Sequence, residues 1–410
     1  MPEFQAPTGT FDVLPPQSAR YERLIALYAQ HVERAGYGLV VSPMFEDVAV
    51  FTRVGESTDV VRKEMYDFED KGGRRIALRP EGTASVVRAF VEHHPLPPFK
   101  AWYAAPNFRY ERPQKGRYRQ HHQLGLEAIG SADPDVDVEV IALAWDLYAQ
   151  LGIGRIRLDL TSLGDEKCRP AYRQLLLDFL ADKELCDEHK DTYTANPLRV
   201  LDCKKPACVA ATQDAPAQLD HLCEECGAHF ARVTQGLEVL GVPYTLNRRL
   251  VRGLDYYTRT TFSFVAESLD SAQNEAGGGG RYDRLVEMLG GPATPAIGFG
   301  LGIERILLVC DAEGVFPAPD STIDVFIVDT TDGTPARDIS VELRRAGIKA
   351  DRAFDGGSFK SQMKRALRSS ARLAIVVEAD GIQLRTLQDK GEPETLERAT
   401  LVDHVRKRLH

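Results

Sequence analysis

Polar side chains in residues 101–130 have a spacing that could bind a small charged ligand. Successive side chains of a β-strand point to opposite faces, so Gln123 and Glu127 would share one face, with Gly125 between them. The leucines that alternate with them would point into the core. A face that carries an amide and a carboxylate, with space beside a glycine, suits a small zwitterion.

The same segment predicts a β-hairpin, because two alternating runs flank a polar loop that contains Gly116. A hairpin symmetric about Gly116 would place Arg109 opposite Gln123, with Glu111 two residues further on. The loop adds three bases, which would suit the phosphates of a nucleotide: Lys115, Arg117 and Arg119. An ordinary antiparallel hairpin with one solvated face is the alternative.

A second polar group lies at a predicted strand-to-helix junction. Residues 76–80 predict a strand and residues 84–91 a helix, with Glu81 and Thr83 between them. A carboxylate and a hydroxyl at this point could receive a substrate ammonium group. The alternative is that they cap the helix, because acidic groups are favoured near a helix N-terminus.

The segment 249–265 combines a predicted strand over 260–265 with aromatic residues before it. Tyr256 and Tyr257 could bond to an imidazole through their hydroxyls while their rings form walls of a pocket. Arg252 precedes them. Strict alternation would put Arg252 and Tyr257 on opposite faces, so a shared pocket requires a turn near Gly253.

Two glycine-rich segments follow. Residues 275–283 contain four consecutive glycines, which permit close backbone approach to a ligand or a flexible loop. Residues 296–309 predict a strand followed by a helix, with Arg305 in the first helical turn. A cation there opposes the helix dipole, which suggests an anionic ligand. A buried strand–helix unit is the alternative.

Composition places these groups in an ordinary globular chain of 410 residues, 43% hydrophobic and 27% charged. This length predicts about two or three domains. No apolar run approaches the roughly 20 residues of a membrane helix, and no secretory signal is evident. We therefore expect a cytoplasmic protein without a membrane partner.

Changes of pattern along the chain predict its domains. A strand-rich region, 1–320, is interrupted by a helix-rich insertion, 168–242. Residues 323–410 alternate strands and helices, which predicts a small α/β domain with a mixed sheet. This last part holds 16 basic and 14 acidic residues in a chain of net charge −9, so it could still contact RNA through a local basic face.

The seven cysteines are odd in number, which disfavours a disulfide framework. Two pairs, Cys203–Cys208 and Cys223–Cys226, have a spacing that could bind one tetrahedral zinc ion. Free buried thiols are the preferred interpretation, because cysteine is a common core residue. A structural zinc stays possible but is not favoured.

Five segments, in order, resemble the histidyl-tRNA synthetase family of class II aminoacyl-tRNA synthetases. Helix 18–35 with strand 39–42 and Pro43 resembles motif 1. Residues 108–113, FRYERP, with 123–127, QLGLE, resemble motif 2, and residues 296–309 resemble motif 3. The two family signatures are similar to 252–257, RGLDYY, and 275–283, EAGGGGRYD, although Arg284 stands where a glycine is usual.

The resemblance implies an α+β fold: a class II catalytic domain with an antiparallel sheet flanked by helices, a helical insertion that embraces the tRNA acceptor arm, and an anticodon-binding domain. It also implies a homodimer. The implied reaction activates L-histidine with ATP and Mg²⁺ to histidyl-adenylate, and then transfers the histidyl group to tRNA(His).

The resemblance assigns site residues as well. Catalysis would rest on four of them: Arg252, Arg109, Glu81 and Gln123. Histidine would be bound by Glu81, Thr83, Gln123, Glu127, Tyr256 and Tyr257. ATP would be bound by Arg109, Glu111, Arg117 and Arg305. No protein metal ligand is assigned.

Three other functions are weighed against this one. A synthetase-like regulatory subunit of histidine biosynthesis would lack the RGLDYY segment and the C-terminal domain, and this chain has both. An RNA-sensing module of a kinase would need a kinase domain. Another class II synthetase would not place Glu127 and Tyr257 as an imidazole pocket.

Overall fold

The computed structural model describes residues 4–55, 58, 60–251, 256–269, 274–319, 323–354, 356–387 and 392–409. The chain divides into two compact units. One consists of Met1–Asp12 and Arg23–Pro317, and the other of Val13–Glu22 and Ala318–His410.

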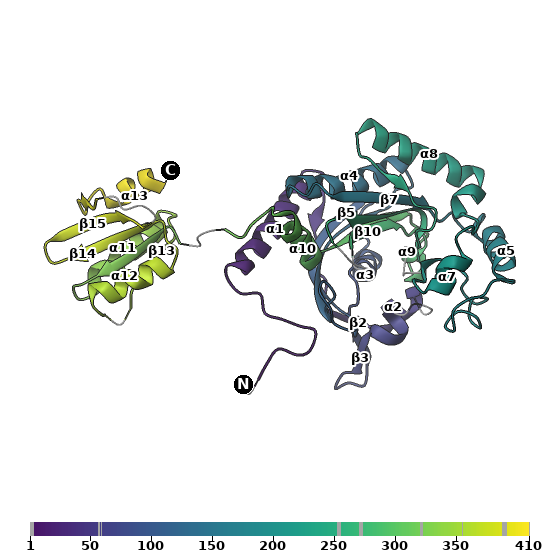
Figure 1. The fold of residues 1–410 in the computed structure, drawn as a ribbon, viewed down its shortest axis with the longest axis horizontal. Helices are drawn as coiled ribbons and strands as arrows, with labels where there is room; N and C mark the ends of the chain where they lie inside the picture. Colours follow the sequence, from purple (N-terminus) through teal and green to yellow (C-terminus); the bar gives the residue numbers. More distant parts are fainter. Residues whose placement is uncertain are drawn as a thin grey trace. The chain divides into compact units, whose positions relative to one another are not determined.

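An eight-stranded sheet forms the centre of the first unit (Figure 1). Its strands, in spatial order, are β1 (Gly38–Leu39), β5 (Phe99–Phe108), β6 (Gln120–Ile129), β11 (Ala296–Gly302), β10 (Glu275–Arg281), β9 (Thr258–Ala266), β7 (Ile156–Ser162) and β8 (Thr245–Leu246). Neighbouring strands are antiparallel, except that β1 runs parallel to β5 and β8 parallel to β7. The antiparallel sheet with flanking helices confirms the predicted α+β class.

Helices cover both faces of this sheet. Helix α1 (Gln17–Glu33) packs on the leucine-bearing face of β6, where Tyr28 meets the Trp102 ring edge-on at 5.7 Å between centroids. The Tyr28 hydroxyl also donates to the carbonyl oxygen of Gly125 at 2.8 Å. Helices α4 (Pro134–Gln150) and α10 (Ile303–Glu313) pack against β6 and β11 (Figure 1). Helix α3 (Thr83–His93) begins on the opposite face, beside Glu127.

A smaller three-stranded sheet lies next to α3. It contains β2 (Phe45–Asp47), β4 (Arg75–Leu78) and β3 (Tyr66–Glu69), and it is accompanied by α2 (Val48–Gly55), the π-helical turn Val60–Glu64 and α9 (Leu285–Met288). Phe51, Phe90 and Val286 join these elements in one buried apolar cluster. The cluster supports the N-terminal end of α3 and the residues just before it.

The segment between β7 (Ile156–Ser162) and β8 (Thr245–Leu246), which we interpret as the insertion, is mainly helical. It contains α5 (Arg169–Leu180), α6 (Leu198–Asp202), α7 (Pro206–Ala211), the 3₁₀ turn Gln218–His221 and α8 (Glu224–Val239). Its own core is small and is formed around Tyr172, Leu176 and Val200. Helix α8 packs along α4, so the insertion contacts a helix that flanks the eight-stranded sheet.

The second unit is built on a five-stranded mixed sheet. Its order is β13 (Ala350–Arg352), β12 (Val325–Asp329), β14 (Leu373–Glu378), β15 (Gly381–Thr386) and β16 (Glu394–Leu396), with helices α11 (Thr334–Arg345), α12 (Phe359–Arg368) and α13 (Leu401–Leu409). Strand β12 is parallel to both neighbours, and β15 is antiparallel to β14. The mixed sheet agrees with the sequence; β16, only three residues long, was not predicted.

The prediction that Arg109 faces Gln123 is wrong. In the structure Gln123 pairs with Ala105, and Arg109 N donates to the carbonyl oxygen of Arg119 at 2.8 Å. The tip is a tight turn closed by Gln114 and Arg117, but the chain bends again beside Arg109 and takes up extra residues on the first arm. Symmetry about Gly116 therefore does not extend into the strands.

Residues 275–281 form strand β10, and not the flexible loop that the four glycines would also allow. A Cβ atom at Gly279 would lie 2.1 Å from the carbonyl oxygen of Gly298 and 2.8 Å from the Phe262 ring. The glycines thus let β10 approach β11 and β9 closely. They are needed for packing within the sheet.

Candidate active site

Nine of the predicted site residues line one cavity of about 490 Å³ on the β6 face. This volume is typical of a small-molecule site. The nine are Glu81, Thr83, Arg109, Glu111, Arg117, Gln123, Tyr256, Tyr257 and Arg305. Of the other two, Glu127 lies behind the wall of the cavity, and Arg252 falls outside the described residues and stays a prediction.

The carboxylate of Glu81 caps helix α3. It accepts hydrogen bonds from the backbone N–H groups of Thr83 and Ala84, each at 2.8 Å, and the Tyr256 hydroxyl lies 3.5 Å away. Burial raises the pKa of Glu81, although these N–H donors oppose the shift. The capping alternative is therefore observed, and it coexists with a position on the cavity wall.

Gln123 is oriented by a neighbour on the hairpin. The Asn107 side-chain amide donates to the Gln123 carbonyl oxygen at 2.6 Å. On the next strand a Cβ atom at Gly300 would lie 3.0 Å from the Gln123 amide nitrogen. Because Gly300 has no side chain, the Gln123 amide has room beside it and keeps its position at the cavity wall.

Glu127 is fully buried in a cage of hydroxyl groups. Thr83 Oγ1 donates to it at 2.8 Å and Tyr103 at 3.2 Å, and Tyr282 donates to its other oxygen. Burial raises the pKa of Glu127 to about 8, against the lowering effect of these donors. Burial thus favours the protonated form of Glu127, and the hydroxyl donors favour the ionised form.

Tyr103 occupies the space that Gly125 provides. A Cβ atom at Gly125 would lie 1.9 Å from Cζ of the Tyr103 ring. The sequence predicted room beside Gly125 but missed the occupant. Tyr103 pairs with Gly125 on the neighbouring strand, and the predicted hairpin register, which was wrong, did not show this pairing.

The other end of the cavity is basic. Arg109 donates through Nε to the carbonyl oxygen of Pro80 at 2.9 Å, and Arg117 pairs with Glu111. Arg305 donates to the carbonyl oxygens of Gly116 at 3.0 Å and Glu275 at 2.8 Å. Arg305 therefore joins the hairpin tip to β10 while it lines the cavity.

His121 also lines this end and was not predicted. Burial, together with the charges of Arg109 and Arg305, lowers the pKa of His121 well below its usual value. A neutral imidazole can accept a hydrogen bond beside two cations. The available signal was its position two residues before Gln123, on the same face of β6.

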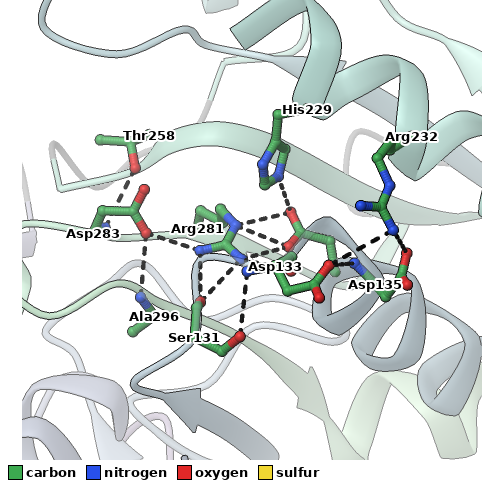
Figure 2. A network of polar contacts seen from close by, with 10 residues as sticks. Ser131, Asp133, Asp135, His229, Arg232, Thr258, Arg281, Asp283 and Ala296 are labelled. Atoms are coloured by element: carbon green, nitrogen blue, oxygen red, sulfur yellow. Dashed lines mark hydrogen bonds and ion pairs between the residues drawn. The ribbon is translucent and has the colours of Figure 1, made fainter. Parts of the chain in front are cut away.

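Arg281 and Tyr282 of the EAGGGGRYD segment contact different parts of the protein. Tyr282 donates to Glu127. Arg281 is fully buried and forms ion pairs with Asp137 at 2.8 Å and with Asp283 at 3.0 Å. Figure 2 shows Arg281 beside Asp283. Asp137 Oδ1 also lies 3.0 Å from Nε2 of His229, which belongs to α8. The network thus joins β10, α4 and the insertion.

Electrostatics favour the charged form of Asp137 in this network. Burial alone would raise the pKa of Asp137, but the hydrogen bond and charge of His229 and the charge of Arg281 lower it below the usual value.

Arg284, where the family usually has glycine, has φ −103° and ψ −9°, which suits any residue. It forms exposed ion pairs with Glu166 and Glu287.

The prediction that the two cysteine pairs could form one metal site is wrong. The pairs belong to separate clusters, and none of the seven cysteines, all within the described residues, forms a disulfide. One cluster contains Cys186, His189, Cys203 and Cys208; the other contains Asp165, Cys168, Cys223 and Cys226. The missing partners were not evident from spacing, because they come from segments earlier in the chain.

Comparison with known proteins identifies the family. The family model "Histidyl-tRNA synthetase" matches residues 9–306, which include the hairpin, the tyrosines and Arg305. The chain belongs to the histidyl-tRNA synthetase family.

Relatives of this histidyl-tRNA synthetase family match over nearly the full chain. The histidine–tRNA ligase of Rhodococcus erythropolis is 48% identical over 98% of this chain and 97% of its own length. That of Saccharopolyspora erythraea is 47% identical, with full coverage of both chains. The apo crystal structure of Staphylococcus aureus histidyl-tRNA synthetase has a TM-score of 0.82 at 35% identity and covers 98% of this chain and 100% of its own.

Proposed function

We propose that this chain is a histidine–tRNA ligase: it activates L-histidine with ATP and transfers the histidyl group to tRNA(His). One observation carries the assignment of the site. A carboxylate, an amide, two tyrosines and several arginines, contributed by segments far apart in the sequence, line a single cavity. The composition of this wall matches an amino acid at one end and a nucleotide at the other.

Glu81, Thr83 and Gln123 would hold the α-ammonium group of histidine. Glu81 is oriented by two backbone N–H groups, and Gln123 is oriented by Asn107. An ammonium group also favours ionised Glu81, whose pKa burial raises in the ligand-free protein. The substrate would therefore supply the positive charge that this buried carboxylate requires.

Glu127 and Tyr257 would hold the two imidazole nitrogens, with Tyr256 as part of the wall. Glu127 is covered by hydroxyl groups in this structure, so an imidazole nitrogen would take the place of one of them. This requirement gives specificity, because an amino acid without an imidazole would leave buried polar groups unpaired. Rejection by such a site can reach about 10⁴-fold.

Histidine's carboxylate attacks the α-phosphorus of ATP, and pyrophosphate leaves. Arg109, and Arg252 by resemblance, would stabilise the charge that develops on the α-phosphate, and Glu111, Arg117 and Arg305 would bind ATP. Orientation of the two substrates supplies much of the remaining rate, so no protein nucleophile is needed.

Mg²⁺ fits this cavity through its carboxylates. Glu111 and Glu304 both line it and offer the oxygen ligands that Mg²⁺ prefers, although both are hydrogen-bonded to protein groups here. They would hold a cation that takes its other ligands from phosphate and water. Bound with ATP, Mg²⁺ would neutralise phosphate charge.

ATP–pyrophosphate exchange tests the first step. We expect exchange with L-histidine and none above background with the other nineteen amino acids. Histidine-dependent exchange must be accompanied by charging of tRNA(His) transcripts. Exchange that responds equally to another amino acid, or no response to histidine, would contradict the proposal.

The second unit would bind the anticodon region of tRNA(His). Helix α12 carries Lys360, Lys364, Arg365 and Arg368, which provide charge for phosphate contacts. Deletion of residues 323–410 should leave pyrophosphate exchange near the full-length rate and reduce tRNA charging strongly. Full charging by the truncated chain would rule out this role.

We also propose a homodimer in the cytoplasm, where its substrates ATP and tRNA are found. Apolar side chains in the motif 1 region are exposed, including Leu39 at 55%, Val41 at 84% and Phe45 at 53%. Such a concentration suits a protein interface. Light scattering should give the mass of a dimer, and Val41→Asp should shift this mass toward that of the monomer.

Of the described helices, none is long and apolar enough to cross a membrane.

A further inference from the structure

A cluster of metal-binding side chains lies in the insertion, apart from the residues assigned to the reaction. Cys186, His189, Cys203 and Cys208 each offer one ligand atom, and all four atoms lie within 4.8 Å of one another. The spacing along the chain is Cys-x2-His followed by Cys-x4-Cys. Paired ligands at short spacing are typical of structural zinc sites.

The distances agree with the edges of a tetrahedron. With Zn–S of about 2.3 Å and Zn–N of about 2.0 Å, tetrahedral geometry separates two sulfurs by about 3.8 Å and a sulfur from a nitrogen by about 3.5 Å. Cys186 Sγ lies 3.9 Å from Cys203 Sγ. His189 Nδ1 lies 3.3 Å from Cys186 Sγ and 3.7 Å from Cys208 Sγ. These three distances are close to the edges of such a tetrahedron, and all four ligand atoms lie within 4.8 Å of one another.

A hydrogen bond from the backbone supports this arrangement. The N–H group of Cys186 donates to Cys208 Sγ at 3.4 Å. Such bonds orient a metal-ligating side chain and stabilise its charge. Cys208 of α7 is therefore hydrogen-bonded to the loop that contains Cys186 and His189.

The local fold gives this site a structural purpose. Helices α6 and α7 have only 5 and 6 residues, and such lengths are not stable without tertiary support. Cys203 caps the end of α6, and Cys208 lies within α7. The small apolar core of the insertion supplies limited support, so one ion that joins both helices to the 186–189 loop would fix all three.

The second thiol cluster differs in a decisive way. Its fourth member is a carboxylate, Asp165, whose Oδ1 already accepts from the N–H group of Lys167 at 3.0 Å and lies 3.5 Å from Cys168 Sγ. Asp165 Oδ2 lies 3.5 Å from Arg259. These bonds describe a hydrogen-bonded turn before α5, and we assign no ion to it.

We propose that Cys186, His189, Cys203 and Cys208 bind one structural Zn²⁺ per chain. The ion fixes the segment between α6 and α7, which includes Lys204, a residue of the cavity wall. Through Lys204 the metal contributes to the shape of the nucleotide site without contact with the reacting atoms. The Zn²⁺ ion is thus a folding element of the insertion.

Metal content of the full-length, untagged protein, purified without added zinc, tests the assignment. Wild type should contain at least about one zinc per chain, and Cys203→Ser and Cys208→Ser should each lose about one. Cys310→Ala is the matched control, because Cys310 is a buried thiol in α10. It should retain the wild-type content. Wild type with less than half a zinc per chain, or serine variants with unchanged zinc, would overturn the proposal.

Substitution of the histidine separates a metal site from a merely well-packed core. His189→Ala should lose the ion, whereas His189→Cys should retain it, because four thiolates also form a zinc site. Replacement of Zn²⁺ by Co²⁺ should give the intense visible absorption of a tetrahedral thiolate site in wild type and His189→Cys only. His189 is only partly buried, so both variants should fold. Equal zinc content in His189→Ala and wild type would contradict the assignment.

Discussion

The hairpin face of the catalytic sheet and the insertion hold their functional groups in different ways. On the sheet, Gln123 and Tyr103 are fixed by continuous β-ladders and by glycines that admit their neighbours. In the insertion, short helices are joined by loops and meet at a cluster of sulfur and nitrogen ligands. A sheet can thus position a ligand site by backbone pairing and by glycines that leave room for side chains, whereas the short helices of the insertion meet through their side chains.

Arg281 lies where these two regions meet, so its loss should have the largest effect on stability. Removal of one partner of a buried ion pair typically costs about 3–5 kcal/mol, because the other charge is left unpaired. We therefore expect Arg281→Met to lower the free energy of unfolding by about that amount in urea titration. Arg284→Ala, three residues later and exposed, should change it by less than about 0.5 kcal/mol. Equal effects of the two would show that the buried network does not join sheet and insertion.

Arg109→Ala should affect catalysis with little loss of stability, in contrast to Arg281. By analogy with removal of one donor to a developing negative charge, we expect adenylate formation to slow by about 10²–10³-fold, or about 2.7–4 kcal/mol. Single-turnover kinetics with histidine and ATP would measure this. Arg112→Ala, an exposed arginine of the same loop, should remain within a few-fold of wild type. A wild-type rate in Arg109→Ala would remove Arg109 from the reaction.

Two Gly→Ala substitutions compare the packing of the regions directly. At Gly125 a Cβ atom would meet the Tyr103 ring, so Gly125→Ala should cost about 1–3 kcal/mol and weaken histidine binding. At Gly227 in α8 no atom lies within 4 Å of the new Cβ, so Gly227→Ala should stabilise by about 0.4–1 kcal/mol. Thermal unfolding with and without histidine would show both effects. A neutral Gly125→Ala would mean that Tyr103 is not held as described.

The pH dependence of the free energy of unfolding should show the raised pKa of Glu127. Its folded-state pKa of about 8 exceeds the unfolded value of about 4.3, so the folded state binds an extra proton between these values. This contribution is present at low pH and is lost as pH rises toward 8, by about 1 kcal/mol between pH 6 and 7. Glu127→Gln should remove this slope. Identical slopes in wild type and variant would show that Glu127 is ionised in the ligand-free protein.

Much of the site could be predicted from strand alternation and the family resemblance, because β6 has a regular register. The alternation correctly put Gln123 and Gly125 on one face, and the resemblance brought Glu81 and Arg305 to the same cavity. The position of Arg109 was missed, because an irregular bend beside it is not encoded in the period-two pattern.

Contacts between distant segments could not be predicted in the same way. The role of Arg281 depends on Asp137 and His229, which lie 144 and 52 positions away in the sequence. The thiol sets likewise depend on how the loops of the insertion fold back, so sequence spacing suggested the wrong partners for Cys203 and Cys208. The sequence shows that such residues could form ion pairs or bind a metal, but only the tertiary fold shows their partners.

A crystal structure of the protein with L-histidine and a non-hydrolysable ATP analogue would test the central claim most directly. The account predicts that both ligands share the cavity, with the histidine ammonium within hydrogen-bond distance of Glu81 and Gln123 and the α-phosphate beside Arg109. Histidine bound elsewhere, or a nucleotide that does not contact Arg109 and Arg305, would contradict it.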